Sequence, residues 1–230
     1  MISSERPQIL ILVGLSLGIV ALTAAAYALD RQLFNRFLGR INPILASVVI
    51  VLVGGFLLLI LVARGWFAIY TPWSLERFLW PAGLVVLLAG LMSLVDARVV
   101  LSEDLNAPLP QSLLYYPVAG YAAELLFHVV PLFLLLTLLT SLSKSIHFEA
   151  VVWPCIIIVS LIEPVFQSRP LIGAYPAWAT AYVFLNVWVI NVAGLTLFNR
   201  YDFVTMYAFR LMYYLLWHIV WGHVRLRLLF

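Results

Sequence analysis

Long apolar runs, separated by short polar breaks, constrain the fold of this chain more than any other feature. A transmembrane helix needs about 20 apolar residues, so the chain has room for about seven spans. Only helices and closed barrels satisfy their backbone hydrogen bonds inside a bilayer. We therefore predict a single all-α domain over residues 1–230, a polytopic transmembrane helix bundle with interfacial segments. The predicted spans are 8–29, 43–63, 79–95, 118–142, 149–166, 175–198 and 203–221.

The composition excludes a water-soluble protein. Hydrophobic residues make up 65% of the chain and charged residues only 10%, whereas soluble domains carry about 25% charged residues. The basic residues stand at the ends of the apolar runs, as bilayer-flanking residues do. The lipid bilayer is therefore the predicted partner, and no nucleic acid is expected. The single lysine, Lys144, lies in a predicted loop, which excludes a retinal Schiff base, and the single cysteine, Cys155, cannot form an internal disulfide.

Aromatic residues and prolines mark the segments where regular helix should be interrupted. Residues 66–77 are rich in Trp and Tyr, which is typical of the lipid headgroup region, so this segment is predicted to be interfacial. Pro117 should separate a short interfacial piece from the fourth span, and Pro131 should kink that span. Pro154 should break the fifth span, and Pro164 should end it.

The distribution of basic residues predicts the orientation in the membrane. Those on the N-terminal side would be Arg6, Arg64, Arg77, Lys144 and Arg200. Those on the opposite side would be Arg31, Arg36, Arg40, Arg98, Arg169, Arg225 and Arg227. The positive-inside rule assigns the larger set to the cytoplasm. We therefore predict a multi-pass protein of a bacterial or archaeal cytoplasmic membrane with its C-terminus in the cytoplasm.

Two glutamates, Glu124 and Glu163, lie inside predicted spans. An ionisable side chain at membrane depth costs about 2.5 kcal/mol or more unless the protein compensates it, so such residues are functional candidates. His128 follows Glu124 by four residues, a spacing that places both side chains on one helix face. These residues form the predicted centre of function. The structural alternative is a protonated Glu124 that bonds His128 within a polar seam between helices.

Further polar residues line the neighbouring spans. Ser160 and Gln167 share a helix face with Glu163, and Asn186 and Asn191 occur in the sixth span. Asparagines in spans most often join helices through hydrogen bonds, so Gln167 and Asn186 are predicted to support the site. In the second span, consecutive glycines at 54–55 predict close packing against a neighbouring helix.

The last span carries a third polar face, on which Arg210, Tyr214 and His218 recur at helical spacing. A buried arginine needs a carboxylate partner. Glu124 and Glu163 are the only buried carboxylates that the pattern predicts, so we expect Arg210 to pair with one of them. Arg210 and Tyr214 are therefore predicted to support the site as well.

Four side chains from three spans, Glu124, His128, Glu163 and His218, are plausible metal ligands. Two imidazole nitrogens and two carboxylate oxygens suit zinc or a similar divalent ion. A metal-bound water could hydrolyse an amide, with Glu124 or Glu163 acting as the general base. The pattern therefore predicts a divalent metal site, with Glu124 and Glu163 as the catalytic candidates.

Three short motifs in order along the chain support a resemblance to a known family. They are AELLFH at 123–128, EPVFQ at 163–167 and HIVWG at 218–222. Over residues 117–222 the chain resembles the CPBP family of CAAX-protease and bacteriocin-processing intramembrane proteases, whose corresponding motifs are EExxxR, FxxxH and HxxxN or HxxxD. The resemblance implies a helical intramembrane metalloprotease that cleaves membrane-embedded peptides.

The chain departs from the family at several key positions. Only Glu124 and His218 match unchanged. The departures are Ala123 for the first glutamate, which is the family's general base, His128 for the arginine, Gln167 for the first histidine and Gly222 for the final Asn or Asp. The resemblance then leaves two interpretations: a rebuilt site in which His128 and Glu163 substitute for lost groups, or a member that no longer cleaves peptides.

Three functions follow from these patterns. The first is a divergent metal-dependent endopeptidase of CPBP type. The second is a catalytically inactive accessory subunit that contacts partner membrane subunits. The third is a haem or pigment protein with His128 and His218 as axial ligands from facing helices. Buried carboxylates also occur as proton relays in transporters, but the chain lacks the internal repeats that are typical of them.

Overall fold

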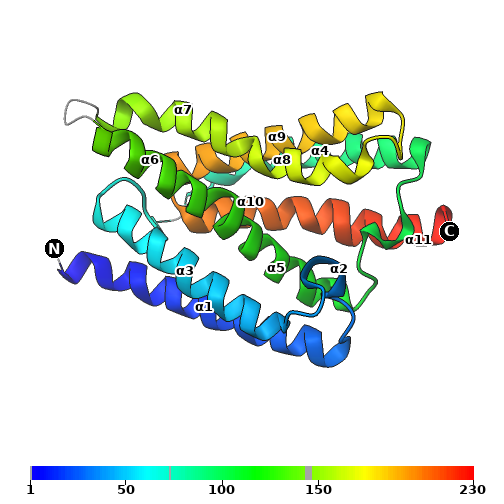
Figure 1. Cartoon of the computed structure of the whole chain (residues 1–230), viewed down its shortest axis with the longest axis horizontal. Coiled ribbons are helices and arrows are strands. Elements are labelled where there is room, and N and C mark those ends of the chain that lie inside the picture. The colour runs from blue at the N-terminus through cyan, green and yellow to red at the C-terminus, as the bar shows by residue number, and fades with distance from the viewer. Residues whose placement is uncertain (1, 73, 143–146) are drawn as a thin grey trace.

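The computed structural model describes residues 2–72, 74–142 and 147–230, and these residues form a bundle of long helices (Figure 1). Within these described ranges, seven helical stretches are long and apolar enough to cross a membrane, which confirms the predicted all-α bundle. Trp73 and Lys144 lie outside the described residues. The elements are α1 (Ile2–Leu29), α2 (Asn35–Leu38), α3 (Pro43–Ala63), α4 (Glu76–Val99), η1 (Glu103–Leu105), α5 (Gln111–Ala123), η2 (Glu124–Val129), α6 (Val130–Leu142), α7 (Phe148–Ser160), α8 (Ile162–Ser168), η3 (Arg169–Leu171), α9 (Ala177–Arg200), α10 (Phe203–Tyr214), η4 (Leu215–Trp221) and α11 (Gly222–Leu228).

The last span runs through the middle of the bundle. It consists of α10, η4 and α11, and α10 contacts α4, α5 and α9. On one side, α1 packs against α3 and α5, and on the other α9 packs against α7 and α8 (Figure 1). Because its neighbours surround it, this span buries two charged side chains, Arg210 and Arg225, to 3% and 0% exposure.

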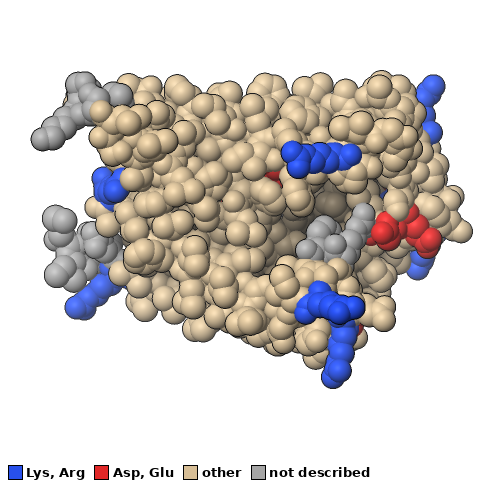
Figure 2. All heavy atoms as spheres, in the orientation of Figure 1, with Lys and Arg blue, Asp and Glu red and all other residues tan. Residues whose placement is uncertain are grey.

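The outer surface of the bundle is apolar over most of its length. Charged side chains lie mostly toward the two ends of the helices, with a broad uncharged band between them (Figure 2). Large exposed hydrophobic residues in this band include Leu17, Leu52, Leu94 and Leu134. Such a surface is stable only in lipid, so the chain is an integral, multi-pass membrane protein.

Side-chain caps explain where two of the spans begin. The Asn42 side chain accepts hydrogen bonds from the N–H groups of residues 44 and 45, and Pro43 occupies the first helical position, where its missing N–H costs nothing. Asp202 caps α10 by accepting the Thr205 N–H at 2.7 Å. The same carboxylate also accepts from the backbone and hydroxyl of Thr71. It thus ties the segment between α3 and α4 to the start of the central span.

The predicted division of the fourth span at Pro117 is wrong. Pro117 lies inside α5, and the helical stretch continues from Gln111 to Leu142. An internal proline costs about 3 kcal/mol in a helix. Here α5 packs against α1, α3 and α10, and neighbouring helices make prolines tolerable within membranes. The irregular part of this span lies further along, at η2, a π-helical turn that ends two residues before Pro131.

The fifth span is broken at Leu161, between α7 and α8, and not at Pro154 as predicted. Pro164 also fails to end the span, since it lies inside α8. A proline cannot donate a hydrogen bond to the carbonyl four residues earlier, which here belongs to Ser160. That carbonyl instead accepts from the Asn191 side chain at 3.2 Å. Pro164 therefore causes the break. The break lies about one turn before the proline, and the Asn191 side chain of α9 stabilises it.

Candidate functional site

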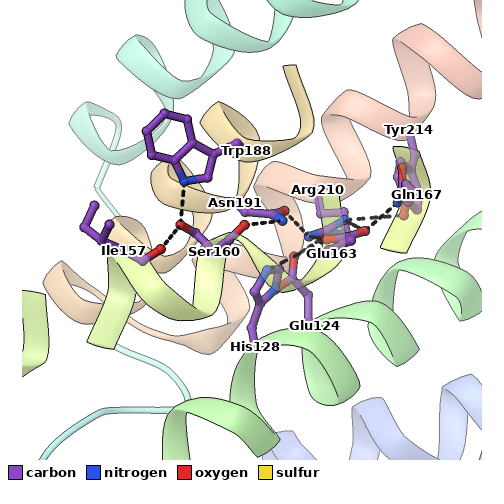
Figure 3. Close-up of polar contacts among 10 residues, drawn as sticks. All are labelled: Glu124, His128, Ile157, Ser160, Glu163, Gln167, Trp188, Asn191, Arg210 and Tyr214. Carbon is purple, nitrogen blue, oxygen red and sulfur yellow. Dashed lines mark hydrogen bonds and ion pairs between the residues drawn. The ribbon is translucent and has the colours of Figure 1, made fainter. Parts of the chain in front are cut away.

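The structure brings Glu124, His128, Glu163 and Arg210 together at the centre of the bundle (Figure 3). Glu124 and His128 come from η2, Glu163 from α8 and Arg210 from α10. Their exposed fractions are 1%, 1%, 1% and 3%. The predicted proximity of Arg210 to a buried glutamate is confirmed, and Arg210 in fact pairs with both. We call these four residues the central cluster.

Arg210 holds the central cluster together because each of its N–H groups faces an acceptor. Its Nε donates to Glu124, and its Nη1 and Nη2 donate to the two oxygens of Glu163, each at 3.0 Å. The remaining N–H groups face the Asn191 Oδ1 at 3.0 Å and the Tyr214 hydroxyl at 3.5 Å. A guanidinium has five N–H donors, and five acceptors surround this one. Removing one partner of such a buried pair costs about 3–5 kcal/mol.

His128 has one satisfied ring nitrogen and one unsatisfied nitrogen. Its Nδ1 lies 2.6 Å from Glu124 Oε2. Its Nε2 is buried without a hydrogen-bond partner among the described residues, and the closest carboxylate oxygen, Glu163 Oε2, is 3.8 Å away. Two carboxylates and one guanidinium leave one negative charge uncompensated. The His128 ring lies between both carboxylates, with Nδ1 toward Glu124 and Nε2 toward Glu163.

Glycines allow the helices to approach the central cluster. A Cβ on Gly54 of α3 would lie 2.8 Å from the Cβ of Leu125, the residue after Glu124, so the predicted close packing of this span is confirmed. Gly120, one turn before Glu124, faces the Tyr214 ring, which would lie 3.4 Å from an added Cβ. The Gly54 contact leaves no room for a side chain between α3 and η2, and Gly120 brings α5 into van der Waals contact with α10.

Hydrogen bonds extend from the central cluster in two directions (Figure 3). Toward the surface, the exposed Gln167 donates to Glu163 Oε1 at 2.8 Å. In the other direction, Asn191 connects Arg210 to the backbone of Ser160, whose hydroxyl accepts from Trp188 Nε1 at 2.9 Å. The face of the molecule in Figure 2 is hollowed between α8 and α5. The central cluster thus joins the helix break to a surface side chain.

Asn186, which was also predicted to support the site, bonds to other residues. Its amide donates to the Leu88 carbonyl at 3.1 Å and to the Tyr182 hydroxyl, and its oxygen accepts from Tyr213 at 2.8 Å. These bonds join α9 to α4 and α10. Asn191 takes the position beside Arg210 instead, although the sequence pattern does not distinguish the two asparagines.

His218 belongs to a different network from the other three predicted ligands. It lies in η4, stacks on Tyr116 with ring centroids 4.6 Å apart, and its Nδ1 lies 3.2 Å from Asn106 Nδ2. Asn106 Oδ1 accepts from Arg225 Nη1 at 3.3 Å. Because an arginine only donates, this bond fixes the orientation of the Asn106 amide. Its nitrogen must then donate to His218 Nδ1, so the neutral imidazole carries its hydrogen on Nε2.

A second buried ion pair, between Asp96 and Arg225, anchors this network, and we call these two residues the distal pair. Arg225 Nε donates to Asp96 Oδ2 at 2.6 Å and Nη2 donates to Oδ1 at 3.1 Å. Arg225 also donates to the carbonyls of Leu101 and Ser102, and Trp221 donates to Asp96 at 2.7 Å. Both charged residues are 0% exposed.

The expectation that Glu124 and Glu163 are the only buried carboxylates is therefore wrong. Asp96 and Asp202 are both 0% exposed. Asp202 pairs with Arg77 at 3.0 Å, in addition to capping α10. Each aspartate lies at the end of an apolar run, where the sequence predicts contact with water. The surrounding helices and loops bury them, and the signal that could have found Asp96 is the i, i+4 pair of Trp221 and Arg225 in the last span.

The donor set as placed does not fit a divalent metal ion. Within the described ranges, no group of three or more His, Cys, Asp and Glu side chains is arranged to hold one. His218 lies apart from Glu124, His128 and Glu163, and both oxygens of Glu163 accept hydrogen bonds from Arg210. A metal ion would have to compete with a buried guanidinium for these oxygens.

Comparisons with models of known protein families, with curated proteins and with solved structures find no match to this chain. The resemblance to the CPBP family therefore stays a prediction from three short motifs.

Proposed function

We propose that this chain is a catalytically inactive accessory subunit of a membrane complex, with a helix arrangement derived from CPBP-type proteases. The observation that supports it is the saturation of Arg210. A general base must be able to take a proton from the nucleophile in a substrate-accessible site. Glu124 and Glu163 are instead buried and bound to one guanidinium, so the central cluster favours a structural role over hydrolysis.

An apolar groove on the lipid-facing surface supports the accessory role. It lies among α4, α7 and α9 and measures about 360 Å³. Its lining residues are Trp80, Ile157, Trp188, Val189, Val192, Ala193 and Thr196. The bond from Trp188 to Ser160 holds one wall in a fixed orientation, and small residues such as Ala193 and Thr196 permit close approach of another helix. We propose that a transmembrane helix of a partner subunit packs in this groove.

The test compares complex formation by three forms of the chain. The wild type should copurify in mild detergent as a complex of defined mass, without stoichiometric zinc and without cleavage of membrane-embedded peptides. Val192→Trp fills the groove and should release the partner. Leu52→Trp, on an exposed face of α3, is the matched control and should retain it. An isolated wild-type chain that cleaves peptides would overturn the proposal.

A divergent peptidase is the second candidate function, and one observation favours it. The unsatisfied Nε2 of His128 lies beside Glu163, which is linked to exposed Gln167. Such a nitrogen is suited to exchange a proton with a bound molecule. If this candidate is correct, Glu124→Gln should abolish peptide cleavage while the helix content stays unchanged. Cleavage at the wild-type rate in that variant would exclude the assignment.

A further inference from the structure

A second groove lies along α8, beside the break between α7 and α8. It measures about 420 Å³, and its lining residues are Phe127, Leu161, Ile162, Val165, Phe166 and Arg169. We propose that this groove holds one acyl chain of an anionic phospholipid, with the lipid phosphate on Arg169. The inference does not depend on the proposed function, because it uses other residues and another surface.

The length of the groove matches one leaflet of a bilayer. It runs along α8 from Leu161, near the middle of the fifth span, to Arg169, near the end of that span at Leu171. Eight helical residues correspond to about 12 Å, and one leaflet contributes about 15 Å of the hydrocarbon thickness. A lipid whose chain lies in the groove would therefore place its headgroup at the level of Arg169.

The walls of the groove are open to lipid and formed by two helix irregularities. The break at Leu161 displaces α8 from α7, and the π-helical turn η2 presents Phe127, whose ring centroid lies 5.5 Å from that of Phe166. Ile162, Val165 and Phe166 are 40%, 42% and 58% exposed. These side chains form an apolar channel that the protein itself leaves uncovered.

Arg169 supplies the charge that selects an anionic headgroup. Its side chain is exposed and has no hydrogen-bond or ion-pair partner among the residues that the structure describes. A guanidinium matches the geometry of a phosphate with two parallel hydrogen bonds. Arg169 also belongs to the membrane side that carries more basic residues, and anionic lipids are concentrated in the cytoplasmic leaflet. The charge of Arg169 and the shape of the groove therefore both fit an anionic phospholipid.

Native mass spectrometry of the detergent-purified full chain tests this proposal. Phosphatidylglycerol and phosphatidylcholine with identical acyl chains are added separately, and the bound fraction of each is measured. Arg169→Gln should lower phosphatidylglycerol binding about five-fold, the effect of one arginine at a membrane surface. Phosphatidylcholine binding should fall less, because its choline cation offsets the charge of the same phosphate. Arg98→Gln is the control, because Arg98 is exposed on the same membrane side and does not line the groove. It should bind both lipids as the wild type does.

A groove-filling variant separates a lipid site from general surface charge. Val165→Trp should reduce the binding of both lipids, since it occupies the channel. Equal effects of Arg169→Gln and Arg98→Gln, or unchanged lipid binding by Val165→Trp, would overturn the proposal. A photo-crosslinking amino acid at position 166 gives an independent readout in membranes. It should yield a lipid adduct, and a polypeptide adduct would show that a protein occupies the groove instead.

Discussion

The central cluster and the distal pair both bury an arginine of the last span, but they balance its charge differently. Arg225 meets one carboxylate, Asp96, and its other donors face backbone carbonyls and Asn106, so the distal pair is neutral. Arg210 meets two carboxylates and lies near a histidine with an unsatisfied nitrogen. A neutral, saturated pair has only a structural task. The central cluster differs in keeping one buried nitrogen, His128 Nε2, without a hydrogen-bond partner among the described residues.

The largest loss of stability should follow the removal of Arg210, the arginine of the central cluster. Arg210→Met leaves two buried carboxylates without a cation, so the free energy of unfolding should fall by more than the roughly 3–5 kcal/mol typical of one broken pair. Circular dichroism during titration with SDS in mixed micelles measures this quantity. Arg98→Met, at an exposed position, should change it by less than about 0.5 kcal/mol. Similar losses in the two variants would contradict the central role of Arg210.

A second test neutralises one carboxylate in the distal pair and one in the central cluster. Asp96→Asn leaves Arg225 with no anionic partner, so unfolding should become easier by about 3–5 kcal/mol. Glu163→Gln should cost only about 1–3 kcal/mol, because Arg210 keeps Glu124 and loses one set of charged hydrogen bonds. The same micelle titration compares them. The reverse order of losses would show that the charge balance inferred for the two regions is wrong.

A substitution in α3 can perturb the packing around the central cluster without changing its charges. Gly54→Ala introduces a Cβ that would meet Leu125 at 2.8 Å, and such overpacking costs about 1–3 kcal/mol. Gly90→Ala in α4 is the matched control, since nothing lies within 4 Å of its added Cβ. Its stability should be unchanged or higher by up to about 1 kcal/mol from helix propensity. Thermal unfolding in detergent measures both, and equal melting temperatures would argue against close contact between α3 and η2.

The smallest loss of stability should come from Gln167, the exposed side chain that bonds to the central cluster. Gln167→Ala removes one hydrogen bond to Glu163, which is worth about 0.5–1.5 kcal/mol. Gln32→Ala is the control, because this exposed residue makes no side-chain hydrogen bond among the described residues. A loss of stability in the control as large as that of Gln167→Ala would remove Gln167 from the cluster.

Some features of the site could be predicted from local spacing. Glu124 and His128 are four residues apart, and the structure keeps them in contact at 2.6 Å. Arg210 was expected to pair with a buried glutamate, because an isolated charge in lipid is costly. His218 shares a helical face with Arg210 by spacing, yet Asn106 from the segment between α4 and α5 binds it in a separate network. Such a long-range partner leaves no local signal.

The irregular parts of the helices were harder to predict than the helices. Pro117 leaves α5 intact because α1, α3 and α10 pack around it. Pro164 acts one turn earlier than expected, since its effect falls on the Ser160 carbonyl, which Asn191 of another span satisfies. The cost of a proline depends on which neighbour compensates the freed carbonyl. That neighbour is decided by the packing of the bundle.

The described residues contain seven helices long and apolar enough to span a membrane. The sequence alone predicts such a bundle, because apolar runs of this length and a shortage of charge favour membrane-spanning helices. It also determined that Glu124 and Arg210 need partners inside that bundle. Only the tertiary structure decided which partners they find, and that Asp96 and Arg225 form a second buried pair. The physical reason is that hydrophobicity is a property of each segment, whereas the compensation of a buried charge depends on the helices that pack around it.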